Sequence, residues 1–213
     1  MRDRLTHVIW IGGGPQAGKT TLSRLLAGKW DLRIYNLDWH AVRDWRATGH
    51  VAAFKRLSMD ERWALPTADE LLTRSIAIWE EGFAFVLADL LALPRSRTII
   101  AEGPGAFPWC VAPIIRSPQQ AIFLVPTPEV RWRNAERRWG PGQPHRWDDT
   151  LTDRARAIAN VRRRDALLDE RITTSCADLG LRCETVDGSR DIDASLELLE
   201  DHFRRHLPAV PNV

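Results

Sequence analysis

Residues 7–20 read His7-Val8-Ile9-Trp10-Ile11-Gly12-Gly13-Gly14-Pro15-Gln16-Ala17-Gly18-Lys19-Thr20. From Gly13 to Thr20 the stretch fits G-x-x-x-x-G-K-[ST], the pattern of a loop that binds phosphate. The apolar run before it predicts a buried strand. Leu22, Leu25 and Leu26 after it predict a helix with Gly28 as its C-cap. Because the pattern has the strand and helix that it requires, we expect this chain to bind a nucleoside triphosphate.

The spacing of the loop suits that chemistry. Glycines let successive backbone N–H groups turn inward around phosphates, and the helix that follows presents its positive end to the same charge. We expect Lys19 to reach the β- and γ-phosphates and Thr20 to supply a hydroxyl ligand for Mg²⁺. The alternative is a glycine-rich turn whose lysine is merely solvated. The predicted nucleotide-binding residues of this segment are Gly13, Gly14, Pro15, Gln16, Ala17, Gly18, Lys19, Thr20 and Thr21.

Length and composition limit the classes of protein that fit. The 213 residues are 44% apolar, which suits one α/β domain over residues 1–213. A net charge of +2 argues against nucleic acid or an acidic membrane as the main partner. Three scattered cysteines without metal-ligand spacing, and a start that leaves no room for a signal peptide, predict a reduced, cytoplasmic protein. No segment reaches 18 consecutive apolar residues, so the sequence predicts no membrane-spanning helix.

The rest of the chain alternates between strand and helix patterns. Further strands are predicted at 32–38, 98–102, 120–125 and 182–186. Thr67 with Glu70 predicts the start of a long helix that stops before Pro94, and Thr127 with Pro128 predicts another. A short helix through about Trp45, a helix from about 151 to 179 and a last helix ending near His206 complete the pattern. Alternation of this kind predicts a parallel five-stranded sheet with helices on both faces.

Carboxylates follow two of the predicted strands. Asp38 comes at the end of the second strand, where it could take a proton from an acceptor hydroxyl; alternatively, it caps the next helix. Glu102 ends the third strand, where it could support Mg²⁺; alternatively, it caps Gly103 or Gly105. Because ligands bind beyond the carboxyl ends of parallel strands, both acids are expected near the phosphate loop.

Arginines follow the fourth strand. Arg133, Arg137 and Arg138 lie on the helix after Pro128, and guanidinium groups stabilise the charge that develops during phosphoryl transfer. The alternative is that they are solvated surface charge. Gly140, Pro141, Gly142 and Pro144 then interrupt the helical pattern. We therefore expect a small lid at about 133–150.

With these residues the chain resembles the phosphate-loop kinase group that includes adenylate-type nucleotide kinases, shikimate and gluconate kinases, and chloramphenicol phosphotransferase. The resemblance rests on 13–20, Asp38, Glu102, the arginine helix at 129–138 and Val-Asp-Gly-Ser at 186–189. It implies a P-loop NTPase fold, ATP and Mg²⁺ as cofactors, and contact between adenine and Asp187, Gly188 and Ser189. The Asp-Arg-Tyr or Asp-Arg-Ser motif of deoxynucleoside kinases is absent, since Glu102-Gly103-Pro104-Gly105 stands in its place.

Two functions are consistent with the pattern. The first is an ATP-dependent kinase that transfers the γ-phosphate to a hydroxyl of a small molecule, such as a nucleoside or nucleotide, a sugar-like metabolite or an antibiotic. Lys19, Asp38, Arg133, Arg137 and Arg138 are then the catalytic residues, and Thr20 and Glu102 the metal-binding ones. The second is a nucleotide-binding ATPase or switch module that acts through a protein partner. We expect a monomer or homodimer with no nucleic-acid or membrane partner.

Overall fold

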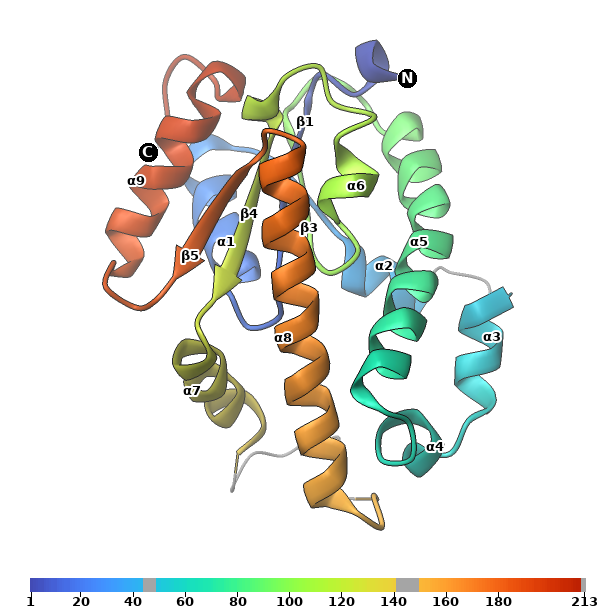
Figure 1. Ribbon diagram of the computed structural model, residues 1–213. Coiled ribbons are helices and arrows are strands. Elements are labelled where there is room, and N and C mark those ends of the chain that lie inside the picture. The colour runs from blue at the N-terminus through green and yellow to red at the C-terminus, as the bar shows by residue number, and fades with distance from the viewer. Residues whose placement is uncertain (44–48, 141–149, 212–213) are drawn as a thin grey trace.

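The protein is described by a computed structural model over residues 1–43, 49–140 and 150–211. Its sheet has five parallel strands in the order β2-β3-β1-β4-β5 (Figure 1). The strands are β1 (Val8–Gly13), β2 (Arg33–Asn36), β3 (Ile99–Glu102), β4 (Ala121–Pro126) and β5 (Arg182–Val186). The prediction of a five-stranded parallel sheet is confirmed.

Helices cover both faces of this sheet (Figure 1). One face is covered by α1 (Lys19–Trp30) and α9 (Ile192–Phe203), which lie side by side. Those on the other face are α5 (Ala68–Ala92), α6 (Pro108–Val111) and α8 (Arg154–Asp178). At the carboxyl ends of the strands lie α2 (Leu37–Arg43) and α7 (Pro128–Trp139). Short 3₁₀ helices span Arg2–Arg4, Pro118–Gln120 and Arg204–His206.

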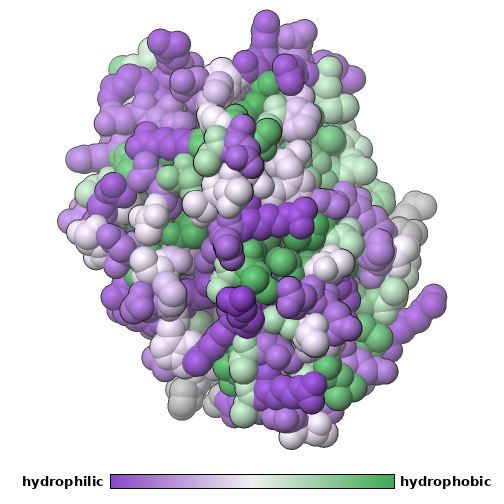
Figure 2. Space-filling model, viewed as in Figure 1, coloured by the Kyte–Doolittle hydropathy of each residue, from purple (hydrophilic) through white to green (hydrophobic). Residues whose placement is uncertain are grey.

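Alternating side chains of the strands fill two separate apolar cores. In β1, Val8 and Trp10 pack toward α5 and α8, whereas Ile9 and Ile11 pack toward α1 and α9. Since both faces are covered, the central strands β1 and β3 are buried along their whole length, as the continuous apolar runs in the sequence predict. On the face drawn in Figure 2, hydrophilic side chains predominate and apolar ones form small scattered patches.

Several helix boundaries follow from local side-chain chemistry. Thr67 accepts a hydrogen bond from the Glu70 N–H, and the Glu70 side chain accepts one from the Thr67 N–H, which confirms the predicted start of α5. Thr127 caps α7 in the predicted way. The predicted C-cap at Gly28 is wrong: α1 continues to Trp30, and Asp31 adopts the left-handed conformation that ends it.

The segment between β2 and α5 differs most from the sequence expectation. Its weak periodicity gave no helix, yet the structure contains α3 (Gly49–Arg56) and α4 (Met59–Trp63). Ser58 and Glu61 form a capping box at the start of α4, and α3 packs against α5. The predicted end of the preceding helix at Trp45 falls outside the described residues.

Candidate active site

The phosphate loop connects β1 to α1 through a backbone with several positive φ angles. Gly13 has φ of 118° and Gly18 has 81°, which glycine adopts without strain. Lys19 is buried, and its Nζ donates hydrogen bonds to the carbonyls of Gly14 (2.7 Å) and Gly13 (3.2 Å). Burial lowers the pKa of Lys19, and the carboxylates of Glu102 and Asp38 oppose that shift. The predicted lysine is therefore part of the loop and not a solvated surface group.

Thr20 and Glu102 meet at the carboxyl end of the sheet. Thr20 Oγ1 donates to both carboxylate oxygens of Glu102, at 3.1 and 3.2 Å. Glu102 is fully buried between β1 and β2, and Asn36 Nδ2 also donates to it. Burial raises the pKa of Glu102, while the hydrogen bond from Asn36 and the charge of Lys19 lower it. These contacts do not support the alternative that Glu102 caps Gly103 or Gly105.

The oxygen donors of this pair fit a magnesium ion. Mg²⁺ favours one or two protein oxygens, with water and substrate phosphates completing its shell. Among the described residues, no cluster of three or more His, Cys, Asp or Glu side chains could hold a metal by itself. The hydroxyl of Thr20 and the carboxylate of Glu102 therefore suit an ion that arrives with the phosphates.

Asp38 lies in the first turn of α2, whereas the sequence placed it at the end of the strand, which stops at Asn36. Asn36 Oδ1 accepts the Trp39 N–H at 2.9 Å and so occupies the capping position of α2. The Asp38 carboxylate is thus not needed as the cap. Although Asp38 is exposed, nearby protein removes enough water from its carboxyl group to raise the pKa, and Lys19 and Arg138 lower it.

The three predicted catalytic arginines lie in different surroundings. Arg133 is exposed, and its guanidinium lies beside the turn after β5: a Cβ built on Gly188 would be 2.9 Å from Arg133 Nη2. Arg138 stacks on Trp139, 4.9 Å from the ring centre, and is close enough to Asp38 to lower its pKa. Arg137 is exposed. The structure therefore brings Arg138 toward Asp38 but directs Arg133 to the turn after β5.

The turn after β5 borders a pocket at the carboxyl end of β4 and β5. Asp187 Oδ1 accepts hydrogen bonds from the N–H and the hydroxyl of Ser189, at 2.9 and 2.6 Å. The pocket is lined by Asp187 and Gly188, by residues of α9 and by the apolar Ala17, Leu22, Leu124 and Val186. The predicted adenine-contacting turn and the phosphate loop thus share one pocket. Thr21, the last predicted nucleotide-binding residue of the loop, is exposed on α1.

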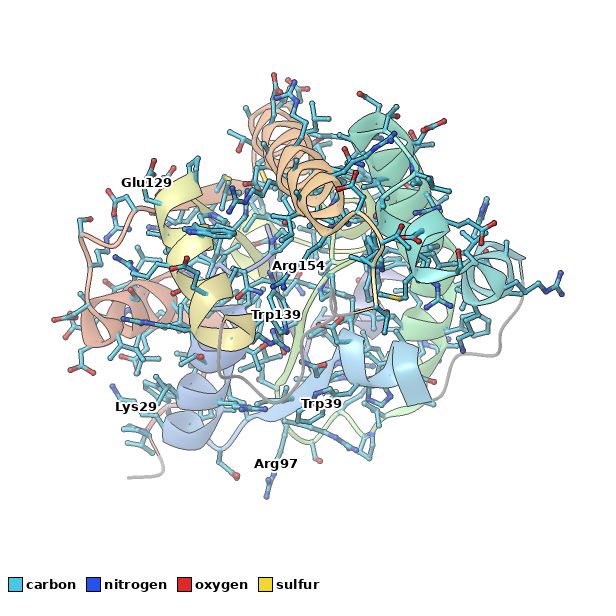
Figure 3. The ribbon with its side chains drawn as sticks, turned by 90° about the horizontal axis from the view of Figure 1, so that it is seen from below. Lys29, Trp39, Arg97, Glu129, Trp139 and Arg154 are labelled. Carbon is cyan, nitrogen blue, oxygen red and sulfur yellow. The ribbon has the colours of Figure 1, made fainter. Side chains whose placement is uncertain are left out.

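Figure 3 looks onto the edge of the sheet where these residues gather. Trp39 of α2, Trp139 of α7 and Arg154 of α8 lie around it.

The predicted lid at 133–150 begins within α7, and its residues 141–149 lie outside the described residues. None of the described helices is both long and apolar enough to cross a membrane.

The sequence analysis assigned no role in the site to four residues at this edge: Asn36, Arg131, Asn134 and Asp169. Asn36 supports Glu102, while Arg131 and Asn134 donate to the phosphate loop and Asp169 pairs with Arg131. The spacing of Arg131 and Asn134, three apart and after the predicted cap at Thr127, could have placed both on one face of the helix.

Comparison with solved structures establishes the fold. The deoxyadenosine kinase of M. mycoides, solved with dATP bound, covers 92% of this chain and 99% of its own, with a TM-score of 0.52 and 12% identity. At this identity the likeness shows that the two chains share their fold. Shikimate kinases from Bacteroides thetaiotaomicron and Acinetobacter baumannii cover 92% and 96% of this chain and 98% and 97% of their own. Their TM-scores are 0.47 and 0.48, and their identities 18% and 14%. No protein-family model matches the chain, and no curated protein matches it in sequence.

Proposed function

We propose that this protein is an ATP-dependent phosphotransferase that moves the γ-phosphate to a hydroxyl group of a small molecule. One observation carries the proposal: Lys19, Thr20, Glu102 and Asp38 gather at one edge of the sheet from α1, β3 and α2. Gly103 makes this approach possible, because its φ of 134° brings the chain after β3 against Leu37, where a Cβ would lie 3.2 Å from the leucine Cβ.

The residues divide the work of the transfer between them. The N–H groups of the loop and the ammonium group of Lys19 bind the donor phosphates, after Lys19 leaves the carbonyls of Gly13 and Gly14. Thr20 and Glu102 would hold Mg²⁺, which supplies positive charge to the phosphate oxygens when bound. The oxygen of the acceptor hydroxyl bonds to the γ-phosphorus, and Asp38 accepts the proton of that hydroxyl. The bond between the γ-phosphorus and the β-γ bridging oxygen breaks at the same time, and ADP leaves.

The arginines have separate roles in this proposal. Arg138, near Asp38, stabilises negative charge on the transferred group, and Arg137 acts with it. Arg133 lies beside Gly188 and contacts the nucleotide from the side of the pocket. The acceptor is a nucleoside or nucleotide, a sugar-like metabolite or an antibiotic.

The test is ATP turnover by the full chain, with and without a panel of hydroxylated acceptors, followed by mass spectrometry of the products. We expect at least one acceptor to raise ADP formation more than tenfold and to gain one phosphate. ATP hydrolysis that no acceptor stimulates would contradict a kinase and favour the ATPase or switch module. GTP in parallel reports the preference for the base.

A further inference from the structure

Side chains hold the carbonyl groups of four consecutive residues of the phosphate loop. Lys19 donates to the carbonyls of Gly13 and Gly14. Arg131 Nε donates to the Pro15 carbonyl at 3.5 Å, and Asn134 Nδ2 donates to the Gln16 carbonyl at 2.9 Å. Arg131 and Asn134 lie three residues apart on α7, so one face of that helix contacts the loop. The helix after β4 therefore supports the loop after β1.

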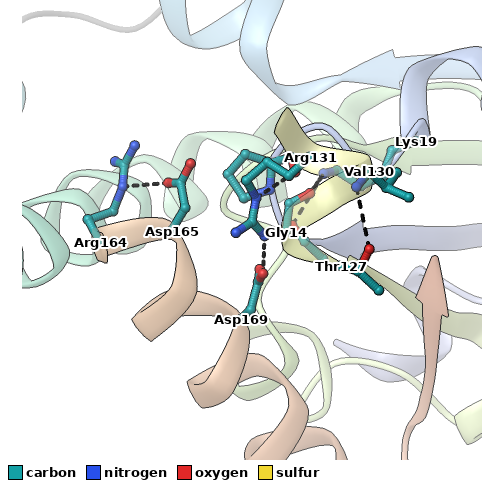
Figure 4. Close-up of polar contacts among 10 residues, drawn as sticks. Gly14, Lys19, Thr127, Val130, Arg131, Arg164, Asp165 and Asp169 are labelled. Carbon is teal, nitrogen blue, oxygen red and sulfur yellow. Dashed lines mark hydrogen bonds and ion pairs between the residues drawn. The ribbon is translucent and has the colours of Figure 1, made fainter. Parts of the chain in front are cut away.

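A buried ion pair fixes Arg131 in this position. Arg131 Nη2 pairs with Asp169 Oδ2 of α8, and both side chains are almost inaccessible to water (Figure 4). The second oxygen of Asp169 lies against the loop itself: a Cβ built on Gly14 would be 2.1 Å from Oδ1. Among the hydrogen bonds of the described residues, Asp169 Oδ1 receives none. Because Asp169 holds Nη2 of the same guanidinium group, Arg131 Nε has little freedom to leave the Pro15 carbonyl.

The backbone of the loop shows why such support is needed. Gln16 has φ of 62°, a left-handed conformation that costs free energy in any residue other than glycine. The hydrogen bond from Asn134 holds the carbonyl of this residue. In a planar trans peptide the carbonyl and the following N–H point in opposite directions. Holding the carbonyls of Pro15 and Gln16 toward α7 therefore turns the N–H groups of Gln16 and Ala17 away from it.

We propose that Arg131, Asn134 and Asp169 are positioning residues that keep the phosphate loop in its anion-binding conformation before nucleotide arrives. Together they orient the N–H groups of Gln16 and Ala17, which then bind phosphate without first reorganising. None of the three touches the reacting atoms. The inference rests on the proposed function in one respect, namely that a triphosphate occupies the loop.

The experiment compares Asn134→Ala and Arg131→Lys with the wild-type full chain. Glu129→Gln is the matched control, because Glu129 is an exposed residue of the same helix. Titration calorimetry measures the Kd of Mg-ATP, and hydrogen exchange of the ligand-free protein reports on residues 13–20. Loss of one such hydrogen bond is expected to weaken ATP binding about tenfold in Asn134→Ala. The loop should exchange faster, while exchange in α5 and the control variant stay at wild-type values.

Kinetics separates positioning from a general loss of structure. A loop that must reorganise before it binds raises KM for ATP, whereas kcat at saturating ATP changes by less than threefold. Arg131→Lys keeps the charge but loses the planar guanidinium group. Its KM for ATP should therefore lie between those of the wild type and of Asn134→Ala. If Arg131→Lys fails to fold, Asn134→Ala alone decides the matter, because it removes one partly buried hydrogen bond.

ATP affinity and loop exchange in Asn134→Ala equal to wild type would overturn the inference. If the wild-type chain binds no ATP at all, the proposed function fails. The exchange of residues 13–20 still tests the positioning in that case, because it is measured without ligand.

Discussion

Replacing Gly14 with alanine perturbs the contact between the phosphate loop and α8. The added Cβ would lie 2.1 Å from Asp169 Oδ1 and 3.0 Å from Pro126 Cδ, so the Asp169 side chain must withdraw. Overpacking of a well-packed site costs about 1–3 kcal/mol. Withdrawal of Asp169 also weakens its buried pair with Arg131, and breaking such a pair outright costs about 3–5 kcal/mol. Because both partners remain in the variant, we expect Gly14→Ala to lower the free energy of unfolding by about 2–4 kcal/mol.

Urea unfolding and thermal melting measure this loss. For a chain of this size each kcal/mol shifts Tm by about 2–4 °C. Gly28→Ala is the matched control, since Gly28 lies within α1 and a Cβ there meets nothing within 4 Å. It should stabilise the protein by about 0.5–1 kcal/mol, because alanine favours the helix. The two glycine substitutions therefore have opposite expected signs.

A double-mutant cycle tests the cause. Asp169→Ala removes the side chain that meets the new methyl group, so the two changes together should cost about 1–2 kcal/mol less than their sum. Additive effects, or a Gly14→Ala protein as stable as wild type, would refute the reasoning.

Three further predictions concern the charged groups. Lys19→Ala should lower the rate of transfer by about 10² to 10³ or more with an unchanged circular dichroism spectrum; turnover within a few-fold of wild type would exclude the phosphate-loop role. Asp38→Asn should lower kcat by about 10² to 10⁴ with little change in ATP affinity. Because the pKa of Asp38 is raised, kcat/KM of the wild type should fall as this group is protonated, at a pH above 3.8. Burial raises the pKa of Asp169 from 3.8 to about 6, despite the opposing charges of Arg131 and Lys19 and with Asp165 as a further raising influence. Between these values the native state binds a proton that the unfolded state has released, so stability falls with rising pH, by at most about 3 kcal/mol. Denaturant titrations from pH 4 to 7 should show this slope in the wild type, and a slope unchanged in Asp169→Asn would assign it to other groups.

The fold could be predicted from the sequence because its signals are local. The run of residues before Gly13 is apolar and predicts a buried strand. Thr67 and Glu70 predict the start of α5 because each side chain accepts a hydrogen bond from the backbone N–H of the other, which needs no distant partner. The Gly28 error is local too. An exposed glycine inside a helix resembles one that ends it, and the left-handed Asp31 gives no clear signal.

The site was only partly predictable because side-chain positions depend on contacts distant in sequence. Glu102 and Thr20 follow from the strand-end rule and the loop pattern, and the structure brings them together. Arg131 could not be distinguished from its neighbours on α7, since its role depends on Asp169, 38 residues further along. Asn36 was read as part of a strand, and only the register with Glu102 shows its function.

The strand order β2-β3-β1-β4-β5 separates the strands that flank 49–66 from those that border the pocket. The strands β2 and β3 lie on one side of β1, and β4 and β5, which border the pocket, lie on the other. The helices do not follow this division, because α4 and α5 both pack against α8. Within 49–66, the carbonyls of Trp63 and Ala64 accept hydrogen bonds from Asn160 of α8. Laboratory evolution of a new preference for the proposed acceptor would therefore have to vary 49–66 together with the side of α8 that faces it, as two separate stretches of the gene.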